Sequence, residues 1–179
     1  MLSPRRRRAS DCGSADVSGL RIYETAVRPD WIDYNGHLRD AYYTLIASEA
    51  TDALMDRVGL DADYRARTGG TLYTVELHVH FLREVKQSDG VLVDLRILGV
   101  DSKRIHASLE ILRGADAEVA ATVELMLLHV RQEPGKVATA PFPQPVAAAL
   151  AELQSATAAM AAGGPGSRRM ELRPAGTRA

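Results

Sequence analysis

The sequence predicts an α+β fold in which a curled antiparallel sheet of about five strands wraps around one long central helix. The first observation behind this is a single strong helical periodicity, which runs from Leu38 to Gly59. The second is a series of four long strand patterns after that helix, separated by short turn-like segments. A sheet that has one apolar face and only one long helix to cover it is expected to curl around that helix.

A short strand and the long helix come first in the chain. Residues 20–27 alternate as a strand does, and the pattern ends at Pro29. After a loop through Gly36, apolar residues recur every three or four positions as far as Gly59, which predicts a helix of about five turns. The stripe expected to face the sheet contains Tyr42, Leu45, Glu49 and Ala53. Because a carboxylate on such a face must be paired or hydrogen-bonded, Glu49 is a candidate functional residue.

The remaining strand patterns cover residues 71–85, 91–100, 104–112 and 118–130, after a polar connection over 61–70. The gaps between them are short, which predicts that successive strands pair as antiparallel hairpins. In the first of these strands, alternation places four apolar residues on one face and three polar residues on the other. The apolar set is Val75, Leu77, Val79 and Phe81, and the polar set is Glu76, His78 and His80. This layout is typical of a hotdog fold, whose units commonly dimerise.

The chain is expected to divide into four parts. Residues 1–19 form a disordered leader with a basic run but no apolar segment of a secretory signal. Residues 20–134 form the hotdog domain, and residues 135–163 a Pro/Ala-rich extension that contains a helix over 145–162. Residues 164–179 form a disordered tail.

Composition narrows the function classes. Hydrophobic residues make up 46%, charged residues 25%, and the net charge is −1, which gives no indication of a nucleic-acid or membrane partner. No apolar run is long enough to span a bilayer. Cys12 is the only cysteine, so no disulfide is expected and a reducing cytoplasm is the natural location. The abundance of Arg and Ala indicates a bacterial genome, and no cofactor is expected.

A metal site was weighed on the second strand pattern. His78, His80 and Glu84 have the spacing of one half of a cupin metal motif, and Glu76 shares the strand face of the two histidines. The second half of that motif is absent, and a five-turn helix after the first strand does not suit a cupin. We therefore predict no metal and expect the two histidines to lie at the surface or at a subunit contact.

The segment WIDYNGHLRDAYY, residues 31–43, carries the most concentrated polar chemistry. Asp33, Asn35 and His37 alternate around Gly36 directly before the helix. The amides of residues 36–38 are expected to point out of the helix N-terminus and to bind the oxygen of a substrate carbonyl. The Asp33 carboxylate would then attack the carbonyl carbon or activate a water molecule beside it. The alternative is that Asp33 and Asn35 only cap the helix or close a turn. No serine nucleophile elbow, P-loop or dinucleotide-binding motif is present.

Residues 27–130 resemble the acyl-CoA thioesterases of the 4-hydroxybenzoyl-CoA thioesterase-like hotdog superfamily. The D-x-x-G-H-L segment from Asp33, the later Tyr43 and the pair Glu49-Ala50 carry this resemblance. Longer segments are similar to the betainyl-CoA thioesterases of carnitine breakdown; they are residues 31–37, 51–54, 73–78, 82–84, 101–106 and 124–130. One departure is Arg39-Asp40, where the superfamily usually has two asparagines.

The resemblance implies hydrolysis of a small acyl-CoA, betainyl-CoA to glycine betaine and coenzyme A, by a homodimer or homotetramer. It makes Asp33 the nucleophile or general base, Gly36 part of the oxyanion site, and Asn35 and His37 groups that orient the loop or the attacking water. The implied substrate-binding residues are Trp31, Tyr42, Glu49, Tyr73 and Glu76, and the implied coenzyme A phosphate ligands are Lys103 and Arg104.

Two other functions stay open at this point. Hotdog enoyl-CoA hydratases use a D-x-N-P-x-H arrangement, to which Asp33-x-Asn35-x-His37 is similar but one residue shorter and without the proline. A non-catalytic hotdog protein that binds acyl-CoA and regulates a partner is the other alternative.

Overall fold

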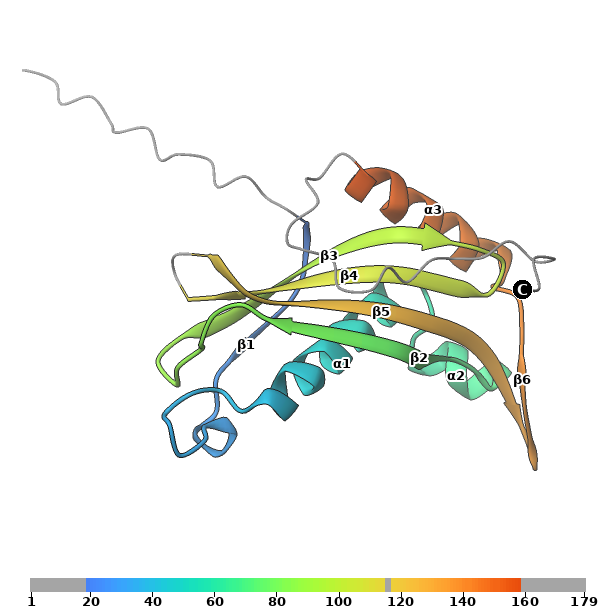
Figure 1. The fold of residues 1–179 in the computed structure, drawn as a ribbon. Coiled ribbons are helices and arrows are strands. Elements are labelled where there is room, and N and C mark those ends of the chain that lie inside the picture. Colours follow the sequence, from blue (N-terminus) through green and yellow to red (C-terminus); the bar gives the residue numbers. More distant parts are fainter. Residues whose placement is uncertain (1–18, 115–116, 159–179) are drawn as a thin grey trace, which may run out of the picture.

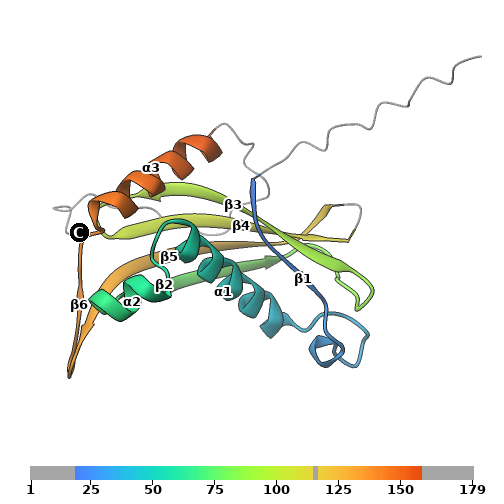
Figure 2. The same ribbon diagram turned by 180° about the vertical axis from the view of Figure 1, so that it is seen from behind.

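The computed structural model describes residues 19–114 and 117–158, which form one curled sheet around a long helix (Figures 1 and 2). The strands lie in the order β1-β3-β4-β5-β2, with β6 beside β5. Their bounds are β1 Leu20–Ala26, β2 Gly70–Phe81, β3 Gly90–Val100, β4 Arg104–Arg113, β5 Glu118–Glu133 and β6 Lys136–Thr139. The helices are η1 Pro29–Trp31, α1 Asp40–Arg57, α2 Ala62–Thr68 and α3 Gln144–Ala158. The predicted α+β hotdog fold is confirmed, with six strands in place of about five.

Helix α1 lies in the concave side of the sheet and forms the centre of the core. Alternate residues of β3 and β4 form the buried face of the sheet: Val91, Val93, Leu95 and Ile97, and Ile105, Ala107, Leu109 and Ile111. On the other face of β4, His106, Glu110 and Leu112 are buried as well. Ala47 and Ala50 of α1 are fully buried, and their small side chains allow the helix to approach the strands closely. Asp40 in the first turn and Arg57 in the last turn complement the helix dipole.

The buried face of α1 differs from the predicted stripe. The fully or nearly fully buried residues of the helix are Tyr43, Ile46, Ala47, Ala50, Thr51, Leu54 and Met55. Leu45 is 40% exposed, and Tyr42, Glu49 and Ala53 lie at the border of the core. The prediction was therefore wrong by one residue, about 100° of rotation around the helix axis. Glu49 sits at this border because α1 also packs on β1, where its Oε2 accepts a hydrogen bond from the Tyr23 hydroxyl at 2.5 Å.

The hairpin predictions are confirmed for β3–β4 and β4–β5 and wrong for β2–β3. Strand β2 pairs with β5, in a register that runs from Gly70 opposite Arg131 to Phe81 opposite Ala121, while β3 pairs with β1. The link over residues 82–89 crosses between the two halves of the sheet. Its Val85 is fully buried, and the Val85 carbonyl accepts the Leu38 amide at 2.7 Å. This bond joins the end of the β2 segment to the loop that precedes α1.

The segment predicted as a polar connection contains helix α2. Asp61 caps it, since its carboxylate accepts the Tyr64 amide at 2.8 Å, and Gly69 ends it with φ +65°. The prediction of a polar connection missed this helix, because a helix of only seven residues shows little periodicity in the sequence.

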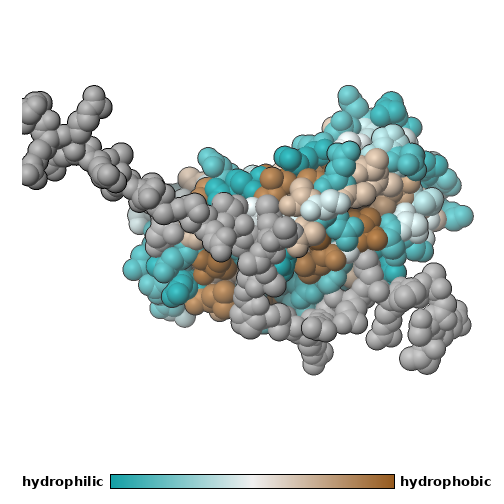
Figure 3. Space-filling model, turned by 90° about the horizontal axis from the view of Figure 1, so that it is seen from above, coloured by the Kyte–Doolittle hydropathy of each residue, from teal (hydrophilic) through white to brown (hydrophobic). Residues whose placement is uncertain are grey.

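Helix α3 covers the outer side of β3, as both views show (Figures 1 and 2). The Thr157 hydroxyl accepts the Ile97 amide at 3.1 Å, which anchors the helix end to the strand. The predicted helix over 145–162 is present as far as Ala158; its last residues, the leader and the tail lie outside the described residues. On the visible part of the face seen from above, apolar residues are interspersed with hydrophilic ones (Figure 3). No helix among the described residues is long and apolar enough to cross a membrane.

Candidate active site

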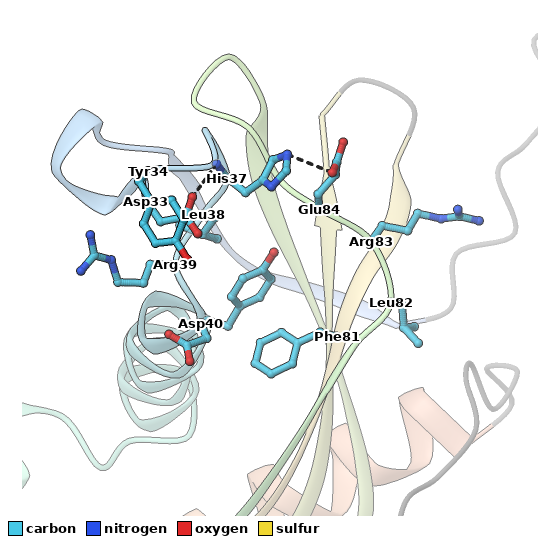
Figure 4. A pocket seen from close by; sticks show the side chains of 11 residues that line it. Asp33, Tyr34, His37, Leu38, Arg39, Asp40, Phe81, Leu82, Arg83 and Glu84 are labelled. Atoms are coloured by element: carbon cyan, nitrogen blue, oxygen red, sulfur yellow. Dashed lines mark hydrogen bonds and ion pairs between the residues drawn. The ribbon is translucent and has the colours of Figure 1, made fainter.

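A cavity of about 640 Å³ opens where the loop before α1 meets the end of β2 (Figure 4). Its walls come from residues 33–34, 37–40, 43 and 81–84. Asp33 and His37 of the predicted catalytic set line it directly. These two segments are far apart in sequence and meet because α1 packs against β2 and because Leu38 bonds to Val85.

The loop around Asp33 is a hydrogen-bonded turn. The Asp33 carboxylate Oδ1 accepts the Asn35 amide at 2.8 Å and the His37 amide at 3.2 Å. The Asp33 amide donates to the His37 carbonyl at 2.8 Å, and Gly36 adopts φ +81°, which glycine tolerates without strain. Asp33 and Asn35 therefore close a turn, as one of the two structural alternatives predicted. They do not cap α1, because Arg39 occupies its N-cap position.

The same turn keeps Asp33 in its charged form. The hydrogen bond from the His37 amide holds the pKa of the Asp33 carboxyl below its usual value, against the opposing effect of burial, and the Asn35 amide adds to the lowering. The carboxylate at the cavity wall is therefore ionised at neutral pH, which is the state that a nucleophile or a general base needs.

A pH profile tests this assignment. Because only the ionised carboxylate reacts and its pKa is lowered, activity should persist as the pH falls to the ordinary aspartate pKa of about 3.9, and should be lost only below it. We expect kcat/KM for a good acyl-CoA substrate to lack an acid limb assigned to Asp33 above that pH. An acid limb near pH 6 that disappears in Asp33→Asn, measured on its residual activity, would contradict the lowered pKa.

The predicted oxyanion site needs a correction. The amides of Gly36, His37 and Leu38 already donate within the protein, to Asp33 and Val85, and the helix begins only at Asp40. The Asp40 amide is the first of α1 and donates to no acceptor among the described residues, and Asp40 lines the cavity. Its neighbour Ala41 donates to the Asp40 side chain at 2.8 Å. The helix N-terminus thus offers a free donor at Asp40, two residues after the predicted set 36–38.

The His37 ring contacts the Glu84 carboxylate on the cavity wall. His37 Nε2 lies 2.9 Å from Glu84 Oε2, and Lys86 Nζ lies 3.4 Å from the other carboxylate oxygen, Oε1. Figure 4 shows the His37 ring turned towards Glu84. The segment after β2 therefore orients the imidazole of the loop before α1. In the sequence, Glu84 stood out only in the cupin-like motif and in the family resemblance.

Aromatic side chains line the cavity next to the carboxylate. Tyr43 and Phe81 pack edge to face, with ring centroids 5.1 Å apart and an interplanar angle of 84°. Tyr43 is buried, which raises the pKa of its hydroxyl, whereas Phe81 is 55% exposed. Sequence reasoning did not assign the cavity residues of the β2 end, Phe81, Leu82 and Arg83, because no local signal links them to Asp33.

The predicted substrate-binding residues near Asp33 in sequence do not line this cavity. Trp31 is buried and stacks on Tyr42 with ring centroids 5.2 Å apart, and Arg28 lies over the indole. Glu49 is bound to Tyr23. Their assignment to the substrate stays a prediction, and in a single chain their contacts are structural.

The other predicted ligands lie farther along the sheet. Tyr73 accepts a hydrogen bond from Gln132 at 2.8 Å, and it is level with Arg104, because both are opposite Leu128 of β5. Eight residues of β2 separate Tyr73 from Phe81, roughly 26 Å at 3.3 Å per residue. Arg104 pairs with Asp101 at 2.6 Å. Lys103 and Arg104 therefore lie far from the cavity of their own chain.

Glu76, the last predicted substrate ligand, contacts His78 at 3.2 Å on β2. Within residues 19–114 and 117–158, no three side chains of the His, Cys, Asp and Glu types are grouped as metal ligands. His78 and His80 of the cupin-like pattern therefore belong to no such group in the described part of the chain.

The family of this chain is identified by a family model that matches most of the described residues. Residues 27–150 match the thioesterase-like superfamily. The chain belongs to this superfamily. This chain shares its fold with the solved structure of a putative thioesterase from Pseudomonas putida KT2440. The two are 42% identical, with a TM-score of 0.72 over 87% of this chain and 97% of that one.

Two relatives are similar over most of this chain. One is the betainyl-CoA thioesterase of Pseudomonas aeruginosa, 44% identical over 79% of this chain and 87% of that protein. The other is the L-carnitine dehydrogenase/betainyl-CoA thioesterase of Agrobacterium fabrum, 44% identical over 68% of this chain. This chain spans only 25% of the length of the Agrobacterium protein.

Proposed function

We propose that this chain hydrolyses acyl-CoA thioesters and that its substrate is betainyl-CoA, which yields glycine betaine and coenzyme A. One observation carries the proposal: the ionised Asp33 carboxylate, oriented by two amides, lines the same cavity as Asp40, the first residue of α1. The similarity to the Pseudomonas aeruginosa betainyl-CoA thioesterase supports the choice of substrate. We place the protein in the bacterial cytoplasm, where acyl-CoA and a single reduced cysteine belong.

The chemistry requires a carboxylate and an oxyanion donor. Asp33 either attacks the thioester carbonyl, to form an anhydride that water then hydrolyses, or removes a proton from the water that attacks. In both routes negative charge develops on the carbonyl oxygen, and the Asp40 amide with the helix dipole is placed to stabilise it. The carbon–sulfur bond then breaks and coenzyme A leaves as a thiolate, which needs no strong acid because thiols have a low pKa.

Coenzyme A phosphates need cations outside the reacting centre. Arg39 and Arg83 lie at the cavity, and Arg83 is 54% exposed with its Nε 3.4 Å from Glu118. A second cavity of about 500 Å³ shares Leu82 and Arg83 with the first and adds Glu118 and Val119. We propose that the pantetheine arm passes along Leu82 and Val119 and that Arg83 meets a phosphate. Lys103 and Arg104 lie far from this cavity in their own chain, so we propose that they meet a ligand held by a second subunit.

We also propose that the protein is a homodimer, or a tetramer built from that dimer, joined through β2. This strand is twelve residues long and lies at one edge of the described sheet. It exposes apolar side chains, including Val75 at 54%. Long, apolar edge strands pair readily with another chain, which supports this edge as the subunit contact.

Substitution of one valine tests the proposed edge. Val75→Lys should shift the mass measured by sedimentation equilibrium towards the monomer value of 19.4 kDa, because it places a charge in the contact. Val137→Lys is the matched control, since Val137 on β6 is equally exposed, at 53%. An unchanged oligomer in Val75→Lys, or dissociation by both substitutions alike, would argue against this edge.

An assay of the purified protein tests the activity itself. Free thiol release is followed with a thiol reagent over a panel that contains betainyl-CoA, acetyl-CoA, benzoyl-CoA and crotonyl-CoA, and hydration of crotonyl-CoA is followed separately. We expect thiol release to be fastest with betainyl-CoA. Hydration without thiol release would favour the hydratase, and tight binding without turnover of any thioester would favour the non-catalytic acyl-CoA-binding protein.

A further inference from the structure

Phe81 presents an unusual surface in the cavity. It is the last residue of β2, it is bulky and apolar, and it is 55% exposed while its neighbour Tyr43 is 3% exposed. Figure 4 shows the Phe81 ring on the cavity side of the strand, between Asp40 and Leu82. An exposed aromatic ring within a cavity that also holds a reactive carboxylate indicates a ligand contact.

The structure of a betainyl thioester decides where its cation must bind. Only one methylene separates the quaternary nitrogen from the thioester carbonyl. Whichever residues recognise the trimethylammonium group must therefore line the same cavity as Asp33. Trp31 and Tyr42 stack on each other outside the cavity wall, and Tyr73 lies roughly 26 Å along β2 from Phe81, so none of the three meets this condition within the chain.

The chemistry of the cation decides what kind of group can select it. A trimethylammonium has no N–H and cannot donate a hydrogen bond, so a carboxylate attracts it only by charge. Aromatic rings attract it through their negative faces, and this interaction strengthens when water is excluded. The edge-to-face packing of Tyr43 and Phe81, with ring planes at 84°, leaves the face of one ring unstacked by the other.

We propose that the Tyr43–Phe81 pair is the specificity determinant for a quaternary ammonium acyl group, and that the Asp33 charge close by reinforces it. This inference rests on the proposed thioesterase function. Phe81 is the exposed member of the pair and the one free to contact the methyl groups directly. Tyr43 is held in the first turn of α1 and positions the Phe81 ring from behind.

The test compares two substrates of the same shape. Betainyl-CoA and 3,3-dimethylbutanoyl-CoA differ only in that a neutral carbon replaces the cationic nitrogen. For the full-length wild-type protein we expect kcat/KM to favour betainyl-CoA by about 10-fold or more. Phe81→Leu keeps an apolar side chain but removes the ring, and it should lower this betainyl-to-neutral ratio by about 3- to 30-fold. Phe81→Trp, which keeps a ring, should retain the ratio.

The outcomes separate this inference from the proposed function. If the wild type cleaves neither thioester, the proposed thioesterase function fails. If it cleaves both equally well, or if Phe81→Leu lowers both rates in proportion, thioesterase activity stands and the cation site is overturned. Should Phe81→Leu not fold, inhibition of the wild type by the two acids decides: glycine betaine should inhibit at lower concentration than 3,3-dimethylbutanoate, and the reverse order would overturn the proposal.

Discussion

Replacing Asp33 with asparagine is expected to lower kcat for acyl-CoA hydrolysis by about 1,000-fold or more, with a much smaller change in KM. General acid–base or nucleophilic groups contribute factors of this order, and a neutral amide can neither attack the thioester nor accept a proton from water. The substitution preserves the shape of the loop, because the asparagine oxygen can still accept the amides of Asn35 and His37. The effect should therefore appear in catalysis and not in folding.

A nearby carboxylate provides the control for Asp33→Asn. Asp30 lies three residues earlier, and its side chain pairs at 3.0 Å with Arg28 at the surface, outside the cavity. Asp30→Asn should leave kcat within about 2-fold of the wild type, since exposed ion pairs contribute little. Full hydrolysis by Asp33→Asn, with a normal circular dichroism spectrum, would show that another group performs the reaction even if the protein is a thioesterase.

The part of the site that the sequence predicted is the part built locally. Asp33, Asn35, Gly36 and His37 form one turn, in which the amides of Asn35 and His37 donate to the Asp33 carboxylate. The oxyanion donor was placed too early because the amides of residues 36–38 donate to Asp33 and Val85, and α1 begins only at Asp40. A sequence pattern does not show which amides a loop consumes.

The rest of the cavity depends on long-range pairing. Phe81 and Glu84 reach Asp33 because β2 pairs with β5 and then leads into the link that carries Val85 to Leu38. The expected β2–β3 hairpin would have placed them elsewhere. Tyr42 and Tyr43 differ for a related reason: consecutive helical residues point about 100° apart, so Tyr43 faces the core and cavity while Tyr42 turns to Trp31.

The corrected face of α1 leads to a stability prediction. Ile46 is fully buried between the helix and the sheet, whereas its neighbour Leu45 is 40% exposed. Ile46→Ala removes buried methyl groups and leaves a cavity in a close-packed core, so it should lower the free energy of unfolding by about 2–5 kcal/mol. For a chain of this size the Tm should fall by roughly 5 to 15 °C.

Leu45→Ala removes a comparable side chain from the adjacent position on the same helix and should lower the free energy of unfolding by less than about 1 kcal/mol. Both variants need comparison by denaturant unfolding at one protein concentration, because the stability of an oligomer depends on concentration. If Leu45→Ala were the more damaging change, the stripe of Tyr42, Leu45, Glu49 and Ala53 would face the sheet as the sequence suggested. Tyr43 would then point away from Asp33, and the edge-to-face contact that positions Phe81 would be lost with it.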